Sequence, residues 1–160
     1  MRWVTGREIV EVYATGADAG PAMFREAQDV DTAAVVLTLD DGTLATATAT
    51  RINGAGYDVR MELAGELDTV AVGLDDRTPI ASTEPAGPPP ADKPWTGFLE
   101  RFGPAYEAEL AAFVEVVRGE RANPCDGREA LQALRVAEAC ELSRHERRPV
   151  QLGEIAGGRD

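Results

Sequence analysis

The strand-forming and helix-forming segments of this chain are segregated along its length. Residues 8–74 carry short, alternating apolar patterns, residues 98–145 carry apolar residues at three- and four-residue steps, and a proline-rich stretch separates the two. Such segregation predicts an α+β fold rather than alternating β-α-β units. We therefore expect an open, mostly antiparallel β-sheet with helices packed on one face.

The clearest local pattern is a β-hairpin around Asp40-Asp41-Gly42. Residues 32–39 and 43–52 are both apolar and rich in Thr or Val, and an Asp-Gly turn between two such runs predicts an antiparallel pair. More strands on either side would extend this hairpin into an antiparallel meander. These expected strands cover residues 8–15, 59–63 and 69–74, and residues 20–29 are expected to form a loop.

One expected strand, at residues 43–50, has two faces with almost no charge. Ala45, Ala47 and Ala49 alternate with Thr46 and Thr48, among other residues. Small side chains cover little surface of their own and allow another layer to approach closely. A sheet buried on both faces predicts self-association, so we expect a homo-oligomer assembled through the sheet face.

Two amphipathic helices are predicted in the second half. The first covers residues 98–117, with Pro104 placed to begin its main part and Gly119 to end it. The second begins at Asp126, which has a Glu three residues later, as in a capping box. A short strand follows at residues 150–152, and the proline-rich residues 75–97 are expected to form a surface loop.

The length of the chain indicates how many domains it forms, and its charge indicates which kinds of partner it is not expected to bind. At 160 residues it predicts a single domain covering residues 1–160, and the formal net charge of -12 disfavours nucleic acid and anionic membrane surfaces. No apolar run is long enough for a membrane span, and no signal peptide is recognisable, so we expect a cytoplasmic protein.

Motifs for catalysis or cofactor binding are absent from the sequence. There is no glycine-rich phosphate-binding motif, and Gly54-Ala55-Gly56 lies between two expected strands instead of opening a helix. With His145 as the sole histidine and no clustered cysteines, we expect no metal site. The catalytic residues, if there are any, stay unassigned.

One cluster of polar residues is a candidate binding site. Arg51 and Asn53 are expected to point the same way at the end of a strand, and Tyr57 to return on the next strand. Mixed donors and acceptors of this kind hold hydroxyl-rich ligands, so Arg51, Asn53 and Tyr57 are candidate substrate-binding residues for a polyol or sugar-like molecule. The alternative is a polar connection between strands with Tyr57 at its rim.

Several short segments, taken in order, resemble a known family. They are Arg2-Trp3-Val4-Thr5-Gly6, Glu11-Val12-Tyr13-Ala14, Asp29-Val30-Asp31-Thr32-Ala33, Gly56-Tyr57-Asp58-Val59-Arg60, Phe98-Leu99-Glu100-Arg101-Phe102, Ala105-Tyr106-Glu107-Ala108-Glu109-Leu110, Asp126-Gly127-Arg128-Glu129-Ala130-Leu131 and Arg148-Pro149-Val150-Gln151-Leu152. As a set they resemble the C-terminal domain of the glucose-fructose oxidoreductase and inositol dehydrogenase family (Gfo/Idh/MocA). The likeness is greatest to myo-inositol 2-dehydrogenases.

The resemblance implies an NAD(P)-dependent dehydrogenase of sugars or cyclitols, with an open sheet whose free face often serves in oligomer assembly. It also implies that the family's Rossmann domain, its catalytic Lys and its catalytic His lie upstream of Met1. Of the family's substrate contacts, only the Tyr of the Gly-Tyr-Asp motif carries over, onto Tyr57. The sole lysine, Lys93, lies in the proline-rich stretch and does not match the catalytic one.

Two functions follow as hypotheses. The first is a substrate-side and oligomerisation domain of an inositol or sugar dehydrogenase, which binds no cofactor by itself and is not redox-active alone. NAD or NADP would then belong to a full-length enzyme or to a separate Rossmann-domain chain. The second is a stand-alone, cofactor-free binding protein, or an isomerase or cyclase that uses carboxylate or Tyr acid–base groups.

Overall fold

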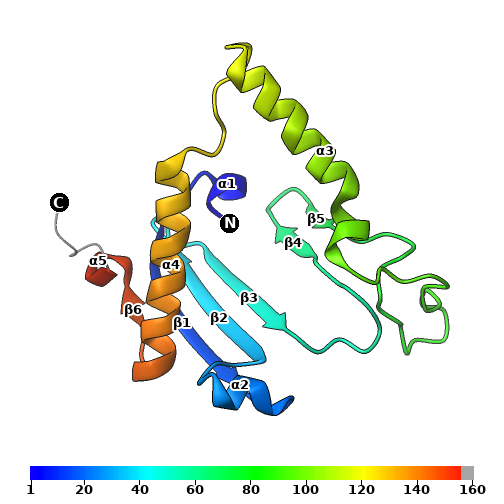
Figure 1. Cartoon of the computed structure of the whole chain (residues 1–160). Coiled ribbons are helices and arrows are strands. Elements are labelled where there is room, and N and C mark those ends of the chain that lie inside the picture. Colours follow the sequence, from blue (N-terminus) through cyan, green and yellow to red (C-terminus); the bar gives the residue numbers. More distant parts are fainter. Residues whose placement is uncertain (156–160) are drawn as a thin grey trace. The chain divides into compact units, whose positions relative to one another are not determined.

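The computed structural model describes residues 1–155, which form two compact units (Figure 1). The first unit contains Met1–Ile52 and the segment that begins at Pro124, and the second unit contains Asn53–Asn123. The second unit is therefore inserted into the sequence of the first. The single-domain organisation of residues 1–160 stays a prediction.

The first unit is built on a four-stranded antiparallel sheet with the strand order β3-β2-β1-β6. The expected hairpin is confirmed: at its turn Gly42 has φ 85° and donates its N–H to the carbonyl of Leu39 at 3.0 Å. A left-handed φ of this kind suits glycine, which explains the Asp-Gly sequence. The strands are β1 (Ile9–Ala17), β2 (Thr32–Leu39), β3 (Leu44–Thr50) and β6 (Val150–Gln151).

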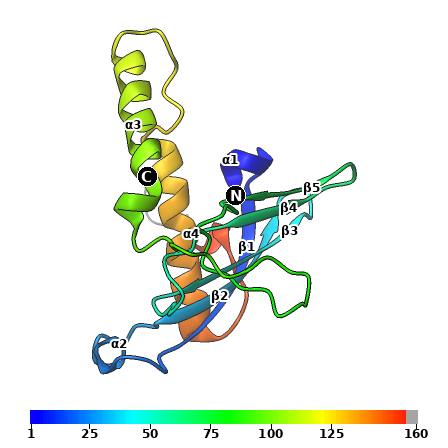
Figure 2. The same ribbon diagram turned by 90° about the vertical axis from the view of Figure 1, so that its right-hand side faces the viewer.

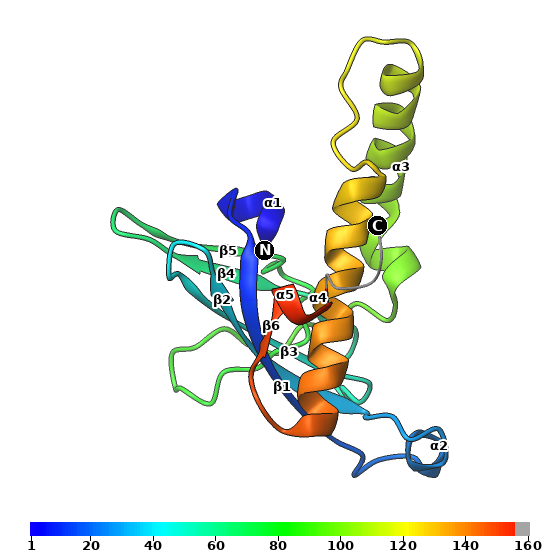
Figure 3. The same cartoon turned by 90° about the vertical axis from the view of Figure 1, so that its left-hand side faces the viewer.

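Helix α4 (Gly127–Glu146) packs against β1 and covers one face of this sheet (Figure 3). The core between them is small: Val12 and Val150 from the sheet and Ala139 from the helix are completely buried. The predicted start of the helix is confirmed, because the Asp126 carboxylate accepts hydrogen bonds from two backbone N–H groups of the first turn. Helix α5 (Leu152–Ile155) follows β6 directly.

The other face of the sheet carries mostly small or uncharged side chains, and its charged strand residue is Glu11, which shares a row with Thr38 and Leu44. Strand alternation is confirmed in β3, where Ala45 and Ala47 pair with Leu37 and Val35, on the face where the core lies. On the opposite face, exposed side chains of three strands lie side by side. They are Tyr13 and Thr15 of β1, Thr32, Ala34 and Val36 of β2, and Leu44, Thr46, Thr48 and Thr50 of β3.

Two short helices of the first unit were not predicted. Helix α1 is Arg2–Thr5, and helix α2 is Ala22–Glu26, within the segment expected to be a loop. That expectation was wrong because Pro21, with φ -57°, starts a helical turn, and Gln28, with φ 57°, ends it. A five-residue helix is too short for apolar periodicity to reveal it.

The second unit contains a hairpin and a long helix. Strands β4 (Met61–Ala64) and β5 (Thr69–Val72) pair antiparallel (Figure 2), and helix α3 is Phe98–Val117. The expected continuous meander is wrong, because β4 and β5 form their own two-stranded sheet. The physical reason is the irregular backbone of residues 51–60, which replaces the tight turn that a meander needs.

Helix α3 has the predicted bounds, Phe98–Val117, but Pro104 does not have its predicted place in the helix. Its first residue is Phe98, so Pro104 lies inside the helix instead of starting its main part. Proline there removes one backbone hydrogen bond, the one that an N–H at position 104 would donate to Glu100. The apolar periodicity that already begins at Phe98 outweighs this loss. Gly119, with φ 75°, follows the end of the helix as predicted.

Candidate functional site

Tyr57 lies in an irregular segment of the chain, not in a strand. Gly56 has φ 142°, and the Tyr57 N–H donates to the carbonyl of Trp95 at 2.6 Å. The backbone donor of Tyr57 is therefore used to hold the end of the proline-rich segment and does not pair with a neighbouring strand. The prediction that Tyr57 lies on a strand was wrong for this reason.

The ring of Tyr57 packs against helix α3 of the same unit. It meets the ring of Phe102 edge to face, with the ring centroids 6.1 Å apart and an interplanar angle of 86°. Tyr57 is half-buried. Within residues 1–155, no hydrogen bond to the Tyr57 hydroxyl is formed, so this polar group has free capacity to donate and accept.

Next to Tyr57, the Trp95 side chain is held between charged groups. The Arg77 guanidinium lies over the Trp95 ring at 3.7 Å from the centroid, and that of Arg101 lies at 5.2 Å. The Trp95 indole N–H donates to both Asp75 oxygens at 3.1 and 3.2 Å, and Arg101 pairs with Asp75 at 3.6 Å. This cation–aromatic cluster ties the two ends of the proline-rich segment to α3.

Two carboxylates at this cluster, Asp75 and Glu100, accept hydrogen bonds that favour their ionised forms. Desolvation would raise the pKa of Asp75, but hydrogen bonds from Trp95 and Thr78 outweigh it and hold that pKa below its usual value. A hydrogen bond from Arg77 lowers the pKa of Glu100. Neither carboxyl group is therefore suited to donate a proton near neutral pH.

The other two predicted site residues are placed differently. Strand β3 ends at Thr50, whereas the expected strand ran to residue 52, so strand alternation does not set the directions of Arg51 and Asn53. Arg51 belongs to the first unit and donates its N–H to the carbonyl of Asp31 at 2.7 Å. Asn53 belongs to the second unit, and its side-chain oxygen accepts the N–H of Ala55 at 3.2 Å. Their roles in substrate binding stay predictions.

The cluster around Trp95 was not identified from the sequence. Asp75, Arg77 and Trp95 belong to a segment without periodicity, and they meet Arg101 only through the fold. The one available signal was a tryptophan inside a proline-rich stretch, since a large aromatic side chain seldom stays without contacts there.

The described residues do not fit a dinucleotide or a metal centre. Gly54 and Gly56 lead into β4, whereas a pyrophosphate site needs glycines that open a helix. Among residues 1–155, no group of three or more His, Cys, Asp or Glu side chains is placed to hold a metal ion.

No helix in this part of the chain is long and apolar enough to cross a membrane, and a cytoplasmic location stays a prediction.

The antiparallel sheet, helix α4 on one of its faces and the order of the elements are those of a class of α+β domain that occurs as the C-terminal domain of oxidoreductases. The chain belongs to the Gfo/Idh/MocA oxidoreductase family, whose C-terminal alpha/beta domain matches residues 1–152. The predicted family and the α+β fold class are confirmed.

Relatives and solved structures agree with this assignment. The chain is 36% identical to the uncharacterized oxidoreductase YrbE of Bacillus subtilis over 89% of its own length and 41% of that protein. It is 37% identical to a myo-inositol dehydrogenase of Streptomyces leeuwenhoekii over 89% of its length and 43% of that protein. The chain thus spans less than half the length of these relatives.

Among solved structures, a probable dehydrogenase from Thermotoga maritima matches with a TM-score of 0.84 and 30% identity, over 96% of this chain and 46% of the other. A scyllo-inositol dehydrogenase from Lactobacillus casei, with bound NAD(H) and scyllo-inositol, matches with a TM-score of 0.81 and 25% identity. That match covers 95% of this chain and 44% of the other.

Proposed function

We propose that the chain is the substrate-side half of an oxidoreductase that acts on inositols or related sugars. The main support is the family match over residues 1–152, together with relatives that are themselves inositol dehydrogenases. Tyr57 supplies the local support, because its side chain is half-buried with its ring against Phe102, while its hydroxyl has no hydrogen-bond partner within residues 1–155.

In this proposal Tyr57 orients the substrate. Its ring is fixed against Phe102 and its backbone against Trp95, so the hydroxyl is held in place before a ligand arrives. A phenol hydroxyl both donates and accepts hydrogen bonds, which suits the hydroxyl groups of a cyclitol. Arg51 and Asn53 remain further candidates for substrate contacts.

The hydride acceptor belongs to another part of the enzyme. Oxidation of a carbinol needs a bound nicotinamide and a general base, and the described residues fit neither a dinucleotide nor such a base. We infer that NAD or NADP is bound by a Rossmann domain outside the described residues, on the same polypeptide or on a separate chain. Residues 1–160 alone are therefore expected to show no redox turnover.

The alternative of an isomerase or cyclase has less support. Such an enzyme needs a carboxyl group that exchanges protons near neutral pH. The two carboxylates at the Trp95 cluster, Asp75 and Glu100, both have lowered pKa values. Asp75 accepts a hydrogen bond from Trp95, and Glu100 accepts one from Arg77. They act as fixed acceptors that hold the cluster together.

We further propose that the chain forms a homo-oligomer through the sheet face of the first unit that lies opposite its core, where Glu11 is the charged strand residue. On this face Tyr13, Val36 and Leu44 are 40%, 45% and 70% exposed, with threonines between them. Two copies of a chain with a net charge of -12 repel each other over most of their surfaces. A face nearly free of charge is where a second copy meets the least repulsion and buries the most apolar area.

The substrate role is tested by titrating the chain with myo-inositol and scyllo-inositol and following its backbone amide signals by NMR. Because half of the enzyme is missing, affinity should be weak, on the order of millimolar, or about -4 kcal/mol. We expect shifts around Tyr57 that saturate, and their loss in Tyr57→Phe with the fold retained.

The matched control is Tyr106→Phe, which removes an exposed phenol from α3 of the same unit. It should bind as the unchanged chain does. Shifts confined to residues far from Tyr57, or equal binding by Tyr57→Phe, would refute the assignment of Tyr57.

A further inference from the structure

A solvent-open cavity of about 480 Å³ is lined entirely by residues of the first unit, whereas Tyr57 belongs to the second. It is lined by residues of α1, of the segment before β1, of α4 and of α5. Its polar lining comprises Arg2, Glu8, Arg128, Glu129, Gln132 and Arg135, and Ile9 and Leu152 add apolar surface. No part of the proposed substrate role uses this cavity.

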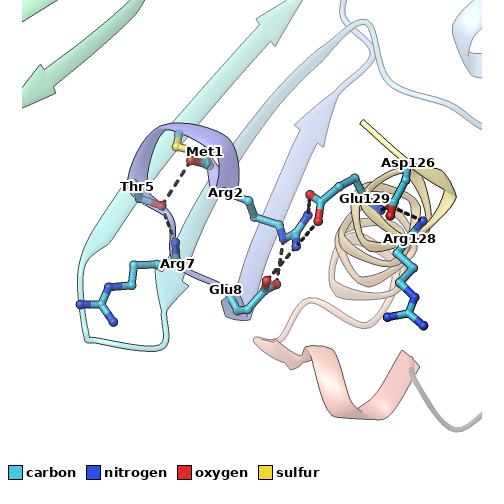
Figure 4. A network of polar contacts seen from close by, with 8 residues as sticks. All are labelled: Met1, Arg2, Thr5, Arg7, Glu8, Asp126, Arg128 and Glu129. Carbon is cyan, nitrogen blue, oxygen red and sulfur yellow. Dashed lines mark hydrogen bonds and ion pairs between the residues drawn. The ribbon is translucent and has the colours of Figure 1, made fainter. Parts of the chain in front are cut away.

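Both carboxylates of the cavity are already engaged by one arginine (Figure 4). The Arg2 guanidinium donates to the two oxygens of Glu8 at 2.7 and 2.8 Å, and to Glu129 at 2.6 Å. The hydrogen bond from Arg2 holds the pKa of Glu8 below its usual value. One guanidinium thus shares its single positive charge between two carboxylates, so Arg2, Glu8 and Glu129 together keep one net negative charge.

The two remaining arginines have no such partner. Within residues 1–155, no carboxylate pairs with the side chain of Arg128 or Arg135. Figure 4 shows the Arg128 guanidinium directed away from Arg2, and Glu154 on α5 is held by Arg148 at 2.8 Å. With three arginines against two glutamates, the lining has a positive excess in a chain whose net charge is -12.

The spacing of these groups indicates the kind of anion. Arg128, Gln132 and Arg135 are four and three residues apart on α4, so they share one helix face, with the arginines about 10 Å apart along the axis. The planar fork of a guanidinium matches the two oxygens of a carboxylate. A ligand with two separated carboxylates can engage both arginines, whereas a single-centred anion cannot do so without drawing them together.

We propose that this cavity binds a small organic dicarboxylate, with one carboxylate on Arg128, the other on Arg135, and Gln132 donating between them. The apolar surface of Ile9 and Leu152 accommodates the carbon chain that joins the two carboxylates. This site shares no residue with the proposed polyol site, whose candidates are Arg51, Asn53 and Tyr57.

The test is an NMR titration of the full 160-residue chain with succinate at low ionic strength, with acetate and inorganic phosphate as comparison anions. We expect saturable shifts at the amides of residues 128–135, with succinate binding at least about fivefold more tightly than acetate or phosphate. Arg128→Gln and Arg135→Gln should each weaken succinate binding about fivefold, since each removes one exposed charge pair.

The control variant is Arg118→Gln, which removes an arginine that follows α3 in the other unit. It should leave succinate affinity unchanged. Because Arg128 and Arg135 lie outside the buried core, both glutamine variants should keep the amide spectrum of the folded chain. Absence of saturation, phosphate or acetate binding as tightly as succinate, or equal weakening by Arg118→Gln would each overturn the proposal.

Discussion

Gly54 and Gly56 have different surroundings, although the sequence presents them as a symmetric pair. A Cβ atom at Gly56 would lie 2.7 Å from the Trp95 carbonyl oxygen and 3.0 Å from Pro79 Cβ, and its φ is 142°. At Gly54 a Cβ atom would meet nothing within 4 Å. Glycine is therefore required at position 56, where the backbone brings the Tyr57 N–H to the Trp95 carbonyl, and not at position 54.

We predict that Gly56→Ala destabilises the second unit by about 1–3 kcal/mol, because alanine is strained at this φ and collides with a backbone oxygen. Gly54→Ala should change the free energy of unfolding by less than about 1 kcal/mol. Chemical denaturation, followed by Trp95 fluorescence in a Trp3→Phe background, measures both. Equal effects of the two substitutions would contradict the role assigned to Gly56.

For individual residues, the sequence was informative where the chemistry is local. Tyr57 was selected because polar residues of several kinds gather near two glycines. Trp95 and Arg77 were missed because their contact depends on the path of a segment without periodicity. Arg51 and Asn53 were assigned a shared direction that only a continued strand would have given them.

Ser143 joins α4 to the sheet where strand pairing stops. Strand β6 pairs with β1 only at Glu11 and Val12, and two residues further the Ala14 N–H donates to Ser143 Oγ at 2.9 Å. The same hydroxyl donates to the carbonyl of Arg148 at 2.6 Å. Ser143 is completely buried, so water cannot replace it as a partner for either backbone group.

We predict that Ser143→Ala lowers the free energy of unfolding of the first unit by about 1–3 kcal/mol, since it leaves a buried N–H and a carbonyl without partners. Ser82→Ala, at an exposed position in the proline-rich segment, serves as the control and should have little effect. Urea denaturation monitored by circular dichroism measures the difference. If the two variants unfold at the same urea concentration, the hydroxyl is dispensable.

Helices and strands were predicted well where their own side chains specify them. The Asp-Gly turn, the Ala/Thr alternation of β3 and the Asp126 cap each act within a few residues, and each was right. The errors concern elements that depend on distant contacts. β4 belongs to a different sheet from β3, because the backbone of residues 51–60 between them is irregular. Helix α3 includes Pro104 because its apolar periodicity already begins at Phe98.

Self-association of the chain is expected to depend on the face of its four-stranded sheet that lies opposite the core and carries Thr46 and Thr48. We predict that the double substitution Thr46→Glu, Thr48→Glu shifts the molar mass measured by light scattering towards that of a monomer, because an assembled sheet face would bury both charges. Ser82→Glu, Thr83→Glu adds the same charge at exposed positions elsewhere and should leave the mass unchanged. A monomeric unchanged chain at micromolar concentration would contradict the proposal.

The division into two units could not be predicted from the sequence. The α+β class follows from segregated patterns, and the family resemblance supports it. A division of the chain at Ile52 and Pro124, however, leaves no mark in composition, since both positions lie in ordinary polar connections. Contacts between residues far apart in sequence, such as Val12 with Val150, decide which segments belong together.

The insertion of the second unit also sets an order of events during synthesis. The ribosome releases β1, β2 and β3 first, while α4 and β6, which complete their core, lie beyond Asn123. At about 5–20 residues per second, several seconds pass before Gly127 follows Thr50. During this interval Val12, Leu37 and Leu39 have no helix to cover them, so the nascent sheet is a target for chaperones or for premature pairing with a neighbouring copy.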